Sequence, residues 1–192
     1  MGRSRSSFRP TAQEPLPGTG EGLPDANPED VARTIALRAL DHAPKTRHQL
    51  AELLESRGIP DDAAAMVLDR FEEVRLIDDA LFAQMWVRSR HSSRGLARRV
   101  LKHELLTKGV AQDDIDVALE QIDDESERLA AEDLARRKIR SMTRLERAAV
   151  KRRLFAMLVR RGYSSSVASK AVEVVLAEQA SEVEAQEGSA VP

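Results

Sequence analysis

Cysteine is absent from this chain of 192 residues, which excludes disulfides, thiol catalysis and thiolate metal sites. Aromatic residues are only 3% of the sequence, and the apolar residues are mostly Ala, Leu, Val and Ile, a composition that suits helices better than sandwiches or barrels. No apolar run approaches the roughly 20 residues that a membrane helix needs. No apolar stretch follows the basic N-terminus, as it would in a signal peptide. We therefore expect a cytoplasmic protein with no membrane partner.

Residue patterns typical of an active site or a metal site are also missing. The glycine-rich stretch at 18–22 has no following Lys-Ser/Thr pair and no preceding strand, which argues against a phosphate loop. The Asp pairs at 61–62 and 78–79 stand just before apolar periodic segments, which favours helix N-caps over metal ligands. None of the four histidines has a metal-ligand spacing to another: His42, His48, His91 and His103. We expect a protein that is not an enzyme, with no catalytic residue, no metal and no cofactor.

One pattern, Leu-x3-Leu-x3-Gly, occurs three times, and its glycines are 51 and 53 residues apart. Each glycine follows a basic residue and precedes an apolar one. The three copies are Leu50-Leu54-Gly58, Leu101-Leu105-Gly109 and Leu154-Leu158-Gly162. A period near 50 residues predicts an array of three similar units.

Each unit is predicted to contain three helices, which makes the fold all-α. Two leucines four residues apart lie on one face of the second helix, and the glycine supplies the positive φ that ends it. First helices are predicted at 31–41, 79–91 and 125–139, and third helices from near 61, 112 and 165 to 74, 122 and 178. Capping boxes are predicted from Thr46 to Gln49 and from Thr143 to Glu146. Because three short helices bury little surface alone, we expect the stacked units to share a core.

Segments at both ends differ in composition from this array. Residues 1–29 contain five prolines and four glycines but few large apolar side chains, so we expect a disordered tail. Residues 180–192 are acidic and small, and we expect the same there. The three units are then assigned to residues 30–77, 78–123 and 124–179.

Charge is sorted into blocks, although the formal net charge of the chain is only −2. Residues 88–108 contain seven Lys or Arg and one acid, residues 113–133 ten acids and one base, and residues 136–161 eleven bases and one acid. One interpretation is a solvated helix face whose bases pair with the acidic block. Pairing within a helix, however, would interleave acids and bases four residues apart. We therefore favour a surface for a phosphate backbone or an acidic protein groove.

The candidate binding residues lie in the second and third units. On a helical wheel Arg98, Arg99 and Lys102 fall opposite the leucines, so we expect them to be free to meet a partner. The full predicted set for binding such a partner is Arg88, Arg90, Arg94, Arg98, Arg99, Lys102, Lys108, Arg147, Lys151, Arg152, Arg160 and Arg161. Few aromatic residues lie among these bases, so stacking on single-stranded bases is not expected to be the main binding mode. Trp86, four residues after Phe82, is predicted to be a core residue.

Three longer stretches together resemble the RecX family, bacterial regulators of the RecA recombinase. They are DDALFAQMWVRSR at 78–90, SRGLARRVLKHELLTKGV at 93–110 and LVRRGYSSSVASKAV at 158–172, and residues 36–60 resemble the first repeat of the family. The resemblance implies tandem three-helix repeats in an elongated, curved array. It also implies a regulator, not an enzyme, that binds the groove of the RecA–DNA filament and inhibits ATP hydrolysis and strand exchange. Such a regulator modulates recombination, DNA repair and the SOS response.

Other functions fit the same residues. Units of three helices are compatible with helix-turn-helix folding, and so with a sequence-specific DNA-binding transcription factor. A third alternative is a helical solenoid that binds only protein. For the regulator we expect the RecA filament as partner, contacts to phosphates of single- or double-stranded DNA, and a monomer, because the sequence shows no uncommitted apolar face.

Overall fold

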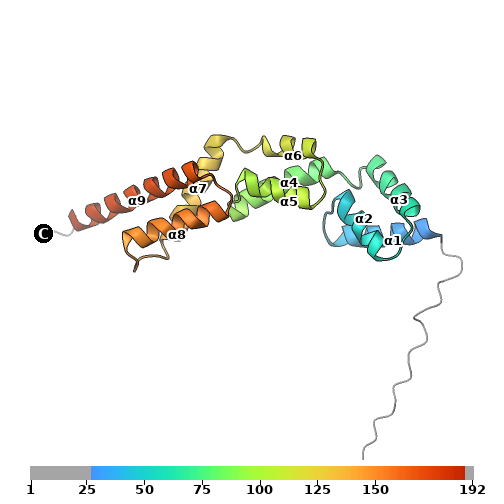
Figure 1. Ribbon diagram of the computed structural model, residues 1–192, viewed down its shortest axis with the longest axis horizontal. Helices are drawn as coiled ribbons and strands as arrows, with labels where there is room; N and C mark the ends of the chain where they lie inside the picture. Colours follow the sequence, from blue (N-terminus) through green and yellow to red (C-terminus); the bar gives the residue numbers. More distant parts are fainter. Residues whose placement is uncertain (1–26, 189–192) are drawn as a thin grey trace, which may run out of the picture.

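The computed structural model describes residues 27–188, with side chains described as far as Glu182, and this range contains nine α-helices and no strand. The helices are α1 (Pro28–His42), α2 (Arg47–Ser56), α3 (Asp61–Glu73), α4 (Asp79–Arg94), α5 (Arg98–Thr107), α6 (Gln112–Leu119), α7 (Asp124–Ile139), α8 (Arg147–Arg160) and α9 (Ser165–Gly188). They form three successive three-helix units in an elongated row (Figure 1). The predicted all-α fold with three tandem units is confirmed.

The predicted N-cap residues are confirmed for α2 and α4 but are wrong for α3 and α8. Thr46 forms a complete capping box at α2, and the side chain of Asp78 caps α4. The prediction for Thr143 is wrong, because the chain still turns there and Glu146 becomes the N-cap residue of α8. Asp61 is not a cap either, since it lies inside the first turn of α3.

Both ends of the array extend further than the sequence predicts. α1 begins at Pro28 because the side chain of Asn27 accepts a hydrogen bond from the Glu29 amide (3.1 Å), and proline fits the first helical position. α9 continues to Gly188 because no Pro or Gly interrupts its sequence before that residue. The predicted tails at 1–29 and 180–192 are therefore wrong where they overlap these helices. Apart from Asn27, their other residues, with the stretch at 18–22, lie outside the described part of the chain.

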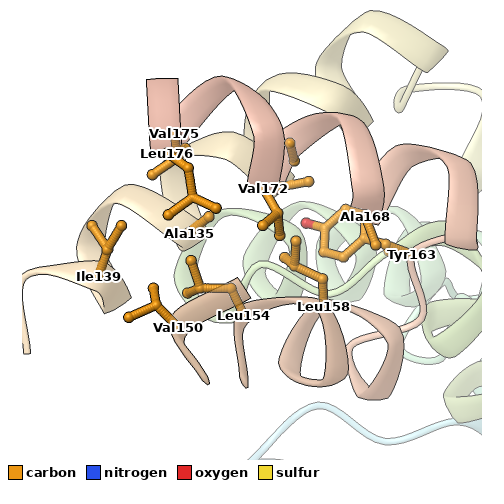
Figure 2. Close-up of a cluster of buried hydrophobic side chains, with 13 residues drawn as sticks. Ala135, Ile139, Val150, Leu154, Leu158, Tyr163, Ala168, Val172, Val175 and Leu176 are labelled. Atoms are coloured by element: carbon orange, nitrogen blue, oxygen red, sulfur yellow. The ribbon is translucent and has the colours of Figure 1, made fainter. Parts of the chain in front are cut away.

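Each unit has its own hydrophobic cluster, which contradicts the expected shared core. The repeated leucines are fully buried inside their own units. In the third unit, Leu154 and Leu158 of α8 pack with Val172 of α9 and Tyr163 (Figure 2). Among the described residues, Ala97 alone is buried in the cluster of a neighbouring unit. Other contacts must therefore join the units.

The second helices of successive units meet end to end. At the junction between units two and three, the Ala97 amide at the start of α5 donates to the Arg161 carbonyl at the end of α8 (3.0 Å). At the junction between units one and two, the Thr46 hydroxyl at the start of α2 donates to the Lys108 carbonyl at the end of α5 (2.6 Å). Each contact gives a partner to a carbonyl that the helix itself leaves unbonded.

Two of the three repeated glycines, Gly109 and Gly162, lie at these junctions. All three have positive φ, at 73°, 74° and 97° for Gly58, Gly109 and Gly162. A Cβ added to Gly162 would lie 2.7 Å from Val100 Cγ2, and one added to Gly109 would overlap the His48 side chain. A Cβ on Gly58 would meet nothing within 4 Å. Only the two junction glycines are therefore required for close approach as well as for their backbone conformation.

Carboxylates reinforce both junctions. Asp79 accepts a hydrogen bond from the Arg47 amide, and Glu127 accepts one from the Arg98 amide, each at 2.9 Å. Burial raises the pKa of Asp79, and the Arg47 amide partly offsets this shift. The guanidinium of Arg98 also pairs with Asp124 and with Glu127 (3.1 Å), and these contacts, the hydrogen bond to Asp124 first, raise the pKa of Arg98. The junction between units two and three is thus an ion-paired joint.

Gly162→Ala is expected to destabilise the protein more than Gly58→Ala does. Both variants place a side chain at positive φ, which costs about 1–2 kcal/mol. Only the change at 162 also forces an overlap with Val100, and accommodating it costs roughly 1–3 kcal/mol more. Urea unfolding followed by circular dichroism measures the difference. Equal losses for the two variants would contradict the close-approach role.

Arg98→Gln is expected to lower the free energy of unfolding by about 1 kcal/mol at low salt, since its side-chain ion pairs are partly exposed. Because salt screens such pairs, the difference from the wild type should shrink in 1 M NaCl. The matched control is Arg99→Gln, an exposed neighbour without an ion pair among the described side chains. Urea unfolding at both salt concentrations tests this. A loss for Arg98→Gln that salt leaves unchanged would contradict an ionic joint.

Candidate nucleic-acid interface

Two of the predicted binding residues on α5, Arg98 and Lys102, have acidic partners within the molecule. Arg98 is held at the junction, and Lys102 pairs with Asp116 of α6 (3.1 Å). A hydrogen bond from Gln112 and the one from Lys102 hold the pKa of Asp116 below its usual value. The expectation that these two cations are free is therefore wrong. The partners lie on the following helices, α6 and α7, so a search for acids along α5 alone misses them.

Two further predicted cations, Arg90 and Lys108, lie over the ring of Trp86. The Arg90 guanidinium carbon is 4.1 Å and the Lys108 Nζ 4.2 Å from the ring centroid. Trp86 also stacks on Phe82 with centroids 5.6 Å apart, and its indole N–H donates to Glu104 (2.8 Å). Trp86 is half-buried at the edge of the second cluster, so the prediction of a core residue is only partly right.

Arg94 and Arg161 lie at the junction of units two and three. The guanidinium of Arg161 donates to the Arg94 carbonyl at the end of α4. Both residues line a groove of about 490 Å³ with Arg137 of α7 and Glu104. Arg161 is therefore a junction residue as well as a cation at the surface.

The other predicted cations are exposed. Arg88 and Arg99 lie on α4 and α5, and Arg147, Arg152 and Arg160 lie on α8. Within the described side chains, none of these five forms an ion pair. Lys151 is also exposed, and its Nζ is 3.7 Å from Glu173 of α9. Most of the available positive charge is therefore on α8.

Two cations that were not predicted complete a groove in the third unit. Lys138 at the end of α7 and Arg153 of α8 line it with Arg152 and Arg160, and its volume is about 430 Å³. Sequence reasoning missed Lys138 because it belongs to another helix, and Arg153 because it falls outside the positions repeated between units. The basic block at 136–161 contains both and was the available signal.

The described residues contain no cluster of three or more His, Asp or Glu that would suit a metal. His48 contacts Glu52 (3.3 Å), and the ring of His91 bonds the Leu96 carbonyl (2.9 Å). Within the same residues, no helix is both long enough and apolar enough to cross a bilayer.

Comparison with known proteins identifies the three units. Residues 32–71, 78–119 and 126–172 match the first, second and third three-helix domains of RecX. The chain is 51% identical over 164 residues to the Regulatory protein RecX of Streptomyces coelicolor, which covers 85% of this chain and 87% of the relative. It is 47% identical over 175 residues to the Regulatory protein RecX of Mycobacterium avium, and the match covers 91% of this chain and 97% of the relative.

A solved structure has the same fold. The crystal structure of RecX from Lactobacillus salivarius superposes with a TM-score of 0.68 at 19% identity, over 77% of this chain and 96% of that one. The three domain matches and the two relatives confirm the sequence resemblance, and the chain belongs to the RecX family of regulatory proteins.

Proposed function

We propose that this protein binds the RecA–DNA filament and inhibits its ATP hydrolysis and strand exchange. Membership of the RecX family carries the proposal. The structure supports it with an elongated row of three units and with exposed cations on α4, α5 and α8. A surface of this kind suits a long partner that carries phosphates or acidic side chains.

Inhibition follows from the length of the row. A row of three joined units touches more than one subunit of a filament, and hydrolysis requires those subunits to rearrange. A bound molecule that favours one arrangement shifts the population toward it and lowers the rate. The cations that remain unpaired, including Arg88, Arg99 and Arg147, supply the attraction and make binding weaker at high salt.

The charges at the starts of α3 and α6 argue against sequence-specific DNA binding by the first two units. In a helix-turn-helix unit, the N-terminal end of the last helix enters the major groove. Here α3 begins with Asp61 and Asp62, and α6 carries Asp113 and Asp114 in its first turn. These carboxylates repel phosphates where a recognition helix must approach the backbone.

Titration of the full-length protein into a bacterial RecA on single-stranded DNA tests the proposal. We expect ATP hydrolysis to fall at substoichiometric protein. The variant R88E/R99E/R147E should need at least tenfold more protein, because three attractions become repulsions. A matched control reverses three other exposed arginines, Arg38, Arg57 and Arg75. It should inhibit like the wild type. Unchanged hydrolysis at excess wild-type protein would refute the proposal.

A further inference from the structure

We propose that the groove between the end of α7 and α8 is a binding site for the phosphodiester backbone of nucleic acid. The residues of this phosphate groove are Lys138, Ser141, Met142, Arg152, Arg153, Ala156, Met157 and Arg160. The inference rests on the proposed function in taking DNA as the ligand. It goes further in assigning direct DNA contact to one groove of the third unit.

The phosphate groove collects positive charge that no described side chain neutralises through an ion pair. Four of its residues are cations, none of its residues is acidic, and none of the four cations forms an ion pair with a described side chain. Three other cations of α7 differ from Lys138, because Arg128, Arg136 and Arg137 all pair with carboxylates. Every ion pair that the described acids of the third unit form is with a cation outside the groove. The groove therefore keeps a positive field that attracts anions.

The fold fixes the spacing of these cations. Leu154 and Leu158 anchor one face of α8 in the third cluster, which sets the orientation of the whole helix. Arg153 and Arg160 are seven residues apart, so they lie on one edge of α8 about 10 Å from each other along the axis. Lys138 reaches the same groove from α7. About 10 Å corresponds to roughly three nucleotide steps of one duplex strand, which rise 3.4 Å each.

The floor of the phosphate groove favours nucleic acid over an acidic protein segment. Ala156 and Met157 lie between the two arginines on the same edge of α8, and Met142 and Ser141 lie in the turn after α7. No aromatic side chain lines the groove, and half of its lining residues are cations, whereas the residues that dominate protein interfaces are enriched in Trp and Tyr as well as Arg. Contacts made by charge alone are typical of backbone binding, which positions a protein without reading the sequence.

The test measures DNA binding by the full-length protein in the absence of recombinase. Fluorescence anisotropy with labelled duplex and single-stranded 24-mers of mixed sequence gives the dissociation constant between 50 and 200 mM NaCl. We expect R152Q/R153Q/R160Q to weaken binding at least tenfold at low salt. The slope of log K against log salt should fall by about 2 to 3, since each lost phosphate contact on duplex DNA contributes about 0.9. Little discrimination between sequences is expected.

The control R38Q/R57Q/R75Q makes the same change in net charge at exposed arginines of the first unit. It should bind DNA within about twofold of the wild type, and thermal unfolding should show that both triple variants are folded. Equal losses in the two variants would overturn the inference and leave a general charge effect. So would undiminished binding by the groove variant, because the DNA would then lie elsewhere.

Comparison with the ATP hydrolysis assay separates this inference from the proposed function. A wild-type protein that inhibits RecA but binds no DNA alone at low salt refutes the phosphate groove and leaves the regulator intact. A protein that binds DNA through the groove but never inhibits RecA supports the groove and refutes the regulator. A groove variant that loses both activities supports both.

Discussion

The end-to-end contact between second helices is the constraint on which the architecture depends. Each unit has a separate core, so the array is held together by a few bonds at each junction. A carbonyl at the end of one second helix accepts a hydrogen bond from the N-cap residue of the second helix in the preceding unit. A glycine beside that carbonyl leaves space for the approach. Gly58 shows the same turn without a neighbour. All three glycines of the repeated pattern therefore mark helix ends, and two of them, Gly109 and Gly162, also mark contacts between units.

The acidic block belongs to this joint as much as to the surface. Asp124 and Glu127 are used by Arg98, and Asp116 is used by Lys102. The side chain of Glu127 is only 13% exposed, so this carboxylate is a structural group. The paired acids contact the second unit, α7 and Lys151, whereas Arg152, Arg153 and Arg160 of α8 form no ion pair with a described side chain. The separation of charges along the sequence thus produces an ion-paired junction between units two and three, next to a basic surface on α8.

Local patterns predicted most of the fold. The glycine turns, the buried leucines and the Thr46 cap depend on residues within a few positions of each other, so the sequence contains them. The candidate site was predicted less well, because the partners of Arg98 and Lys102 come from other helices. The groove that brings Lys138 to Arg153 also requires knowing how α7 packs on α8. The distribution of charge along the sequence therefore located the basic region. It could not distinguish cations that form ion pairs within the molecule from cations that are exposed and can bind a partner.

Two electrostatic systems in one molecule complicate any single measurement of salt dependence. Salt screens the Arg98 joint and the phosphate groove together, so loss of inhibition at high salt has two physical sources. Salt has opposite effects on the stability of these two regions. It weakens the ion pairs that hold the junction together, but it also weakens the repulsion between neighbouring cations of the groove. Salt is therefore expected to destabilise the junction between units two and three and to stabilise the third unit. The geometry of the three-unit row and the attraction of its cations for a partner therefore both change with salt concentration and are coupled.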